Sequence, residues 1–235
     1  MSAKQDIRDI ELCKLEKFCL DQNLPKFRSK QIWEWLWQKK AVSFEEMTSL
    51  PIELRDLLDE NFYINTVSIN KKESSSDGTV KFSLKLYDKH QVEGVLIPSK
   101  NRITACVSSQ AGCGLSCNFC ATGTLKLTRN LSASEIYDQV YILNRQAKLI
   151  YGKPLSNIVF MGMGEPLLNY KNLLRSIYFI TNKWGLSMSH KRITVSTAGI
   201  AKMIKKLGDD KVRFNLAISL HSANDKQRSS LMPIN

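Results

Sequence analysis

The sequence contains no apolar run that approaches the ~18–20 residues needed to cross a bilayer. Its N-terminus, MSAKQDIRDIELCK, is polar and lacks the apolar segment of a secretory signal. Acidic residues are also scarce, with 22 Asp and Glu against 34 Lys and Arg, for a net charge of +12. We therefore expect a cytoplasmic protein with no membrane partner. The charge favours a polyanion such as nucleic acid, although a lysine-rich solvated surface would give the same balance.

Cysteine is present at only six positions, and no cysteine follows Cys120. Four of the six, starting at Cys106, fall within fifteen residues. Without a secretory signal, such clustering indicates metal or redox chemistry rather than a disulfide framework. Cys113, Cys117 and Cys120 spell C-x3-C-x2-C on a loop that follows a strand expected over residues 103–109.

Three thiolates on one loop can bind three irons of a [4Fe–4S] cluster and leave the fourth iron open. The open iron could chelate the amino and carboxylate groups of S-adenosylmethionine (SAM) and pass an electron to its sulfonium. A structural zinc site is the alternative, but zinc usually takes four ligands in two pairs, and no histidine lies near these cysteines in sequence. We predict that Cys113, Cys117 and Cys120 are cluster ligands.

The hydrophobic pattern predicts an α/β protein in three parts. Residues 1–65 have apolar positions at helical spacing, and Trp33 and Trp37 share a face that we expect to form core. Residues 66–102 alternate apolar and polar positions around polar turns, which predicts an antiparallel β unit. In residues 103–235 apolar strands alternate with helices, which is typical of parallel βα units, and a Ser-x-x-Glu capping box at residues 132–135 predicts the start of one of these helices. Four strands fit there, so we expect an incomplete βα barrel with an open edge.

The motifs resemble the radical SAM superfamily and, within it, the RlmN/Cfr family of RNA adenine methyltransferases. The resemblance covers the whole chain, including the helical N-terminal part. It implies a barrel of six βα units, of which about four are present, and a sequence truncated before its C-terminal third. It is carried by the cysteine motif and by four further segments: CVSSQAGC (residues 106–113), MGMGEPLLN (161–169), TVSTAG (194–199) and AISLHS (217–222).

The last three segments would line the SAM pocket. Glycines after a strand allow the backbone to approach a ligand closely, although a strand-to-helix turn alone would require them too. Glu165 offers an anionic partner for the methionine amino group. The later motifs fall at strand ends, where barrel enzymes place their sites. By this resemblance the SAM-binding residues are Gly164, Glu165, Ser196, Ser219, Leu220 and His221.

Two further residues match catalytic positions of the family. Cys106 would otherwise be an ordinary buried strand cysteine. By resemblance it resolves a covalent protein–RNA adduct by forming a disulfide. Glu93 matches the family's proton acceptor, whereas on its own it would be a solvated hairpin carboxylate.

The resemblance implies a mechanism that uses two SAM molecules and an external electron donor. One SAM methylates a cysteine far downstream, and the second is cleaved to a 5′-deoxyadenosyl radical that activates this methyl group for addition to an adenine. The substrates would be 23S rRNA and tRNA, and we favour ring carbon C2 over C8 because the C2 branch is the housekeeping one. Residues 1–65 would help to hold RNA through cations interleaved with aromatic side chains. We expect a monomer.

Because no cysteine follows Cys120, the methyl-carrying cysteine is missing from this sequence. We therefore expect that the 235-residue chain does not methylate RNA alone. Three alternatives stay open: an incomplete iron–sulfur RNA-binding fragment, a radical SAM enzyme that needs no carrier cysteine, and a zinc-binding RNA module.

Overall fold

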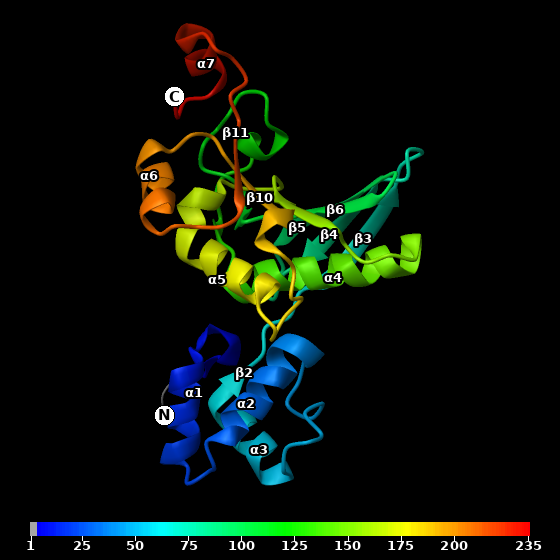
Figure 1. Ribbon diagram of the computed structural model, residues 1–235, viewed down its shortest axis with the longest axis vertical. Coiled ribbons are helices and arrows are strands. Elements are labelled where there is room, and N and C mark those ends of the chain that lie inside the picture. The colour runs from blue at the N-terminus through cyan, green and yellow to red at the C-terminus, as the bar shows by residue number, and fades with distance from the viewer. Residues whose placement is uncertain (1–3) are drawn as a thin grey trace. The chain divides into compact units, whose positions relative to one another are not determined.

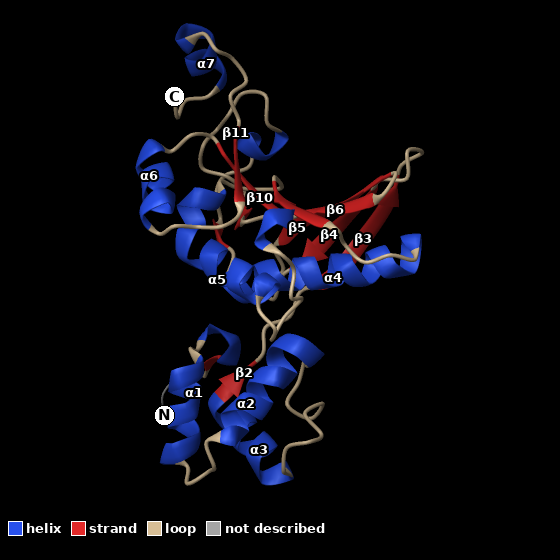
Figure 2. Ribbon diagram, viewed as in Figure 1, coloured by secondary structure: helices blue, strands red, loops and turns tan. Residues whose placement is uncertain are grey.

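The computed structural model describes residues 4–235, which divide into two compact units. One unit comprises Met1–Thr66 together with Phe179–Ser187. The other comprises Val67–Tyr178 together with Met188–Asn235. Figures 1 and 2 show a helical part and a part built around a sheet. Within the described residues, no helix is both long and apolar enough to pass through a bilayer.

The first unit is mainly helical, as its apolar spacing predicts. Trp37 is fully buried and Trp33 is 4% exposed, so both form core as expected. The ring of Phe179 stacks on Trp37, with centroids 3.4 Å apart. The elements of residues 5–63 are β1 (Gln5–Asp6), η1 (Ile7–Asp9), α1 (Leu12–Asp21), α2 (Phe27–Glu34), the π-helical turn η2 (Trp35–Lys39), α3 (Ile52–Asn61) and β2 (Phe62–Tyr63).

The second unit contains a seven-stranded sheet in the order β11-β10-β9-β6-β5-β4-β3. Strands β3 to β6 pair antiparallel, and β6, β9, β10 and β11 pair parallel in chain order. This is the predicted open βα arrangement, and the strands of residues 66–102 continue the same sheet. The strands are β3 (Ser68–Ser74), β4 (Val80–Lys85), β5 (Gln91–Ser99), β6 (Arg102–Cys106), β9 (Asn157–Phe160), β10 (Ile193–Thr197) and β11 (Asn215–Ile218).

Four helices accompany this sheet: α4 (Ala133–Tyr151), α5 (Tyr170–Thr181), α6 (Ala201–Asp209) and α7 (Asp225–Leu231). The predicted capping box begins α4, because Ser132 accepts from the Glu135 amide and the Glu135 carboxylate accepts from the Ser132 amide. Helix α4 lies along one face of the sheet (Figure 1).

The two faces of the parallel strands differ in chemistry. Ala105, Ile158 and Ile193 are in register on the face toward α4 and are fully buried. Cys106, Thr194 and Ser196 alternate with such residues and point to the other face, where they are half-buried. The polar side chains that could do chemistry therefore share the face away from the helix.

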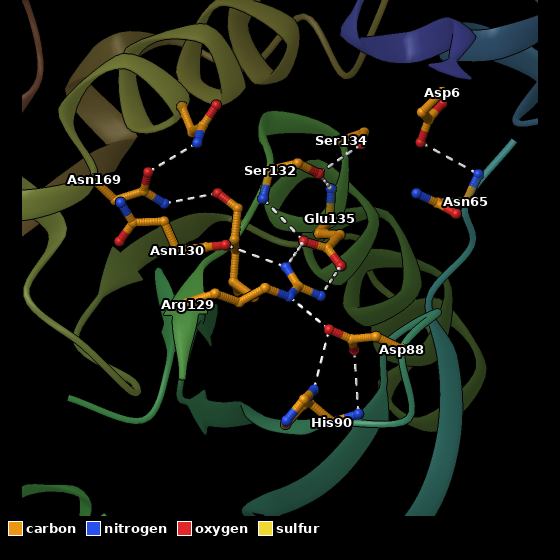
Figure 3. A network of polar contacts seen from close by, with 12 residues as sticks. Asp6, Asn65, Asp88, His90, Arg129, Asn130, Ser132, Ser134, Glu135 and Asn169 are labelled. Atoms are coloured by element: carbon orange, nitrogen blue, oxygen red, sulfur yellow. Dashed lines mark hydrogen bonds and ion pairs between the residues drawn. The ribbon is translucent and has the colours of Figure 1, made fainter. Parts of the chain in front are cut away.

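The cysteine loop, residues 112–128, is closed at its base by two short strands, β7 (Gln110–Ala111) and β8 (Arg129–Asn130). Arg129 binds Glu135 through two 2.8 Å hydrogen bonds and donates from Nε to Asp88 at 2.6 Å (Figure 3). Asp88 lies in the turn between β4 and β5, and its carboxylate also contacts His90 Nδ1 at 3.0 Å. This network fastens the base of the loop to the sheet and to α4.

The Arg129 side chain lowers the pKa of Asp88 to about 2. Because the folded pKa lies below the unfolded value, Asp88 stabilises the fold above pH ~4, and this contribution is lost as the pH falls toward ~2. We expect Asp88→Asn to lower the free energy of unfolding by about 2 kcal/mol at neutral pH and by about half as much near pH 3. Urea unfolding at both pH values measures this. The exposed Asp56→Asn is the control, and an equal loss at both pH values would contradict the expectation.

Candidate SAM and iron–sulfur site

A cavity of about 270 Å³ is formed by the cysteine loop and the carboxyl ends of β9, β10 and β11. Most of the predicted site residues line it, although they come from four separate stretches of sequence. Leu220 does not line it, and its side chain is 55% exposed. The predicted residues in the cavity wall are Cys113, Cys117, Cys120, Gly164, Glu165, Ser196, Ser219 and His221.

The three cysteines are half-buried, and their thiols lie within electrostatic reach of one another. Burial raises the pKa of Cys113 and of Cys117, and the neighbouring thiols raise the pKa of Cys117 further. In residues 4–235 no group of three or more His, Cys, Asp or Glu side chains is placed to hold a single metal ion. A cubane does not require such convergence, because each cysteine binds a different iron. Three thiols around one cavity fit a [4Fe–4S] cluster with one open iron.

The glycine-rich loop after β9 packs against the segment that follows β6. Gly164 has φ +93°, and a Cβ there would lie 2.5 Å from Gln110 Cβ. A Cβ on Gly162 would lie 2.7 Å from Ser108 Oγ. Ser108 Oγ also accepts from the Met163 amide at 2.9 Å. These glycines are therefore required by loop-on-loop packing, in addition to the close approach of a ligand that the sequence suggests.

Glu165 is 3% exposed, and its carboxylate is held by two backbone amides. Oε1 accepts from Leu167 at 3.0 Å, and Oε2 accepts from Ala198 at 2.7 Å. Its own amide donates to Gln110 Oε1 at 2.8 Å. The carboxylate thus bridges the ends of β9 and β10 while lining the cavity, where its remaining lone pairs can accept from an ammonium group.

The strand-end residues of β10 and β11 meet on the same side of the cavity. Ser196 Oγ and Ser219 Oγ are 3.1 Å apart and share a hydrogen bond. His221 has a left-handed backbone, with φ +58°, and its ring centroid lies 4.0 Å from that of Phe119 in the cysteine loop. The cavity wall therefore includes two hydroxyl groups and an imidazole in addition to the three cysteines.

Several residues of the site were missed from the sequence. Met232 is 1% exposed and lines the cavity. Gln110 is buried between Glu165 and Asn130, and its amide donates to Asn130 Oδ1 at 2.7 Å. The only local signal for Gln110 is its place in the segment that leads into the cysteine loop. Nothing local marks Met232.

Cys106 and Glu93 lie beside this cavity rather than in its wall. Cys106 on β6 pairs with Val95 on β5. Glu93 lies two residues before Val95 on the same strand, so Glu93 and Cys106 share a face of the sheet. Glu93 lines a separate cavity of about 270 Å³ together with Ala121 and Thr122 from the end of the cysteine loop. It also forms a 3.3 Å ion pair with Lys81. The two residues expected to act on RNA are therefore neighbours on one face.

No disulfide is present, and all six cysteines are free thiols. The disulfide implied by the family resemblance is thus not supported in this chain.

Burial raises the pKa of the Cys106 thiol, and the Glu93 carboxylate raises it further. A thiolate is disfavoured beside another negative charge, so removal of that charge must lower the pKa. We expect Glu93→Gln to shift the pH profile of Cys106 alkylation by iodoacetamide to lower pH in the cluster-free chain. Peptide mass spectrometry measures this, with Glu53→Gln as the control. An unchanged profile would show that the two residues do not interact.

An open parallel βα sheet with three loop cysteines beside glycine-rich and serine strand ends defines a radical SAM protein. Residues 107–234 match the family model of the radical SAM superfamily, and residues 5–64 match that of the ribosomal RNA large subunit methyltransferase N-terminal domain. The chain belongs to the RlmN family of radical SAM methyltransferases.

The relatives agree on this family. A probable dual-specificity RNA methyltransferase RlmN of Cytophaga hutchinsonii is 55% identical over 99% of this chain and 64% of its own length. The dual-specificity RNA methyltransferase RlmN of Geobacter sulfurreducens is 45% identical over 100% of this chain and 63% of its own length. A crystal structure of a radical SAM methyltransferase from Sphaerobacter thermophilus superimposes with TM-score 0.87 at 38% identity, covering 98% of this chain and 68% of that one. The chain thus spans less than two thirds of the length of these two curated relatives.

Proposed function

We propose that this chain carries the SAM-cleaving part of an RNA adenine methyltransferase. One observation carries the proposal: a single cavity is lined by the three C-x3-C-x2-C cysteines, the glycine-rich loop and the strand-end serines and histidine. Family membership supports the same chemistry. The sheet supports the site, because the cavity walls other than the cysteine loop and Met232 are strand ends or the loops that follow paired strands.

Cys113, Cys117 and Cys120 would hold the [4Fe–4S] cluster. When bound and reduced by an external donor, the cluster supplies the electron that cleaves the sulfonium of SAM. Glu165 would accept hydrogen bonds from the methionine amino group, and its two backbone contacts keep the carboxylate fixed for this task. Ser196 and Ser219 would bind the hydroxyl groups of the nucleoside. His221, packed on Phe119, would close the cavity beside the cysteines.

By the family resemblance, the methyl acceptor would be ring carbon C2 of an adenine in 23S rRNA and in tRNA. The relatives are named dual-specificity RNA methyltransferases. Glu93 would accept a proton from the protein–RNA adduct. In the family mechanism, Cys106 would then form a disulfide with the methyl-carrying cysteine as that cysteine's sulfur–carbon bond to the RNA breaks. Residues of the helical unit would contact phosphates. Two of its cations are ion-paired, Lys26 with Glu16 at 3.0 Å and Lys39 with Glu34 at 3.5 Å. Arg28, which donates to the neutral Gln31 side chain at 2.8 Å, and Lys30 are therefore the stronger candidates.

A second function is favoured by one observation, namely that none of residues 121–235 is a cysteine that could carry a methyl group. For a polypeptide limited to residues 1–235 we therefore propose SAM cleavage without methyl transfer. In that state it would be an iron–sulfur protein that binds RNA.

Anaerobic reconstitution with iron and sulfide, followed by SAM, dithionite and transcripts of 23S rRNA and tRNA, tests both functions. We expect 5′-deoxyadenosine without methylated adenine. Methylated adenine from the isolated chain would overturn the proposal that this chain cleaves SAM without transferring a methyl group. Absence of 5′-deoxyadenosine with zinc bound at the cysteines would overturn the SAM-cleaving function itself.

A further inference from the structure

Helix α7 follows β11 and lies beyond the end of that strand (Figure 1), and none of its residues was singled out from the sequence. Its N-cap is Asn224, whose side chain accepts from the Gln227 amide. Its contacts on two sides give it a role in the candidate SAM site.

On one side, Arg228 binds main-chain carbonyl groups from two strand ends. Its Nη2 donates to the Ala198 carbonyl after β10 and contacts the Ser219 carbonyl at 3.5 Å. Its Nε donates to the Leu220 carbonyl at 3.2 Å. Nη1 donates to the side chain of Asn235. Arg228 forms no ion pair within residues 4–235, so its planar guanidinium is used on backbone and amide oxygens.

On the other side, the end of α7 binds the cysteine loop. The Asn118 side chain donates to the Ser230 carbonyl at 2.6 Å, and the Asn118 amide donates to the Leu231 carbonyl at 3.0 Å. Asn118 lies between Cys117 and Cys120. The residue after the helix, Met232, is buried against the cavity.

We propose that Arg228 is a positioning residue for SAM, and that α7 acts as a strap that fixes the strand-end wall of the cavity relative to the cysteine loop. The inference rests on the proposed SAM-cleaving function and deepens it. Arg228 does not line the cavity. It acts through Ala198 and Ser219, whose carbonyl groups it holds and which do line it.

The backbone conformation of His221 explains why this segment needs the hydrogen bonds from Arg228. A left-handed conformation is unfavourable for a residue with a Cβ and persists only where its surroundings enforce it. His221 has φ +58°, and the carbonyl immediately before it, on Leu220, is the one that Arg228 Nε binds. Loss of this hydrogen bond would free the segment that places Ser219 and His221.

The first test uses the cluster-free chain and amide hydrogen exchange. The Ser219 amide donates to the Thr197 carbonyl at 2.9 Å, and the Ala198 amide donates to Glu165, so both are protected when the wall is ordered. We expect Arg228→Gln to accelerate exchange at these two amides about tenfold or more, since hydrogen bonds to a charged donor are lost. The Val107 amide, bonded to Val159 between β6 and β9, should be unchanged.

The control is Lys226→Gln, which removes the same charge from an exposed position of the same helix. It should change neither set of amides. Arg228→Lys should give an intermediate result, because an ammonium group cannot reach three carbonyl groups in a fixed fork. Equal acceleration at Val107 would indicate general destabilisation and would overturn a positioning role, as would no acceleration at Ser219.

The second test uses the reconstituted chain and the equilibrium affinity for SAM. We expect Arg228→Gln to weaken binding about tenfold or more at unchanged iron content, with Lys226→Gln unaffected. Equal affinities for the two variants would overturn the inference. If the unsubstituted chain takes up no cluster, the proposed function fails, while the exchange experiment still decides whether Arg228 orders the wall.

Discussion

Cys117→Ser should abolish the iron–sulfur absorbance of the reconstituted chain and reduce bound iron to background. In a cluster held by three thiolates, each of three irons has one protein ligand. The serine hydroxyl group does not ionise at neutral pH and is a poor iron ligand, so the substitution leaves one of these irons without its protein ligand. The same result is expected for Cys113→Ser and Cys120→Ser. The effect is measured by the absorbance of the cluster's sulfur-to-iron charge-transfer bands in the visible range, together with chemical analysis of bound iron and sulfide.

Cys13→Ser is the matched control, because Cys13 is an exposed free thiol in the other unit. It should leave cluster content unchanged. If Cys117→Ser retains the cluster, or if Cys13→Ser loses it as well, the assignment of the three loop cysteines is wrong.

Gly164→Ala should eliminate SAM binding and destabilise the fold by about 2 kcal/mol or more. At φ +93° an alanine is strained, and its Cβ would lie 2.5 Å from Gln110 Cβ, which is too close for any side-chain rotation to relieve. The loop must shift, and Glu165 moves with it because its amide is bound to Gln110. Urea unfolding and SAM affinity together measure the two effects.

Gly208→Ala is the control, since Gly208 lies in α6 and a Cβ there would meet no other atom within 4 Å. It should be neutral or raise stability by up to about 1 kcal/mol, because alanine favours a helix over glycine. A Gly164→Ala chain with unchanged stability and SAM affinity would show that the loop tolerates a side chain and that its packing does not position the site.

Local signals in the sequence predicted those parts of the fold that depend on neighbouring residues. The Ser132–Glu135 capping box, the helical stripe containing Trp33 and Trp37, and the apolar strands were all recognisable because each depends on a short period or a fixed offset. The cysteine spacing was recognisable for the same reason. The predicted strand over residues 103–109 is the exception, since β6 ends at Cys106.

That difference has a physical cause. Beyond Val107, whose amide still donates to the Val159 carbonyl, the chain leaves the β6–β9 pairing, because Ser108 and Gln110 turn inward to bind the glycine-rich loop about 55 residues away. Such polar contacts between distant loops leave no periodic pattern. The role of Arg228 could not be predicted for the same reason. Arg228 binds backbone carbonyl groups, which every residue has, so the sequence does not mark its partners. Helix α7 has seven residues and no buried side chain, so it has no apolar stripe from which a helix could be predicted.

The central claim is that the three cysteines hold a cluster whose open iron meets SAM in the cavity beside Glu165 and Ser196. The most direct measurement is electron paramagnetic resonance of the anaerobically reconstituted and dithionite-reduced chain, recorded with and without SAM. We predict the signal of a reduced [4Fe–4S] cluster and a clear change in its g-values when SAM is added. A cluster signal that SAM leaves unchanged, or zinc in place of iron at these cysteines, would contradict the account.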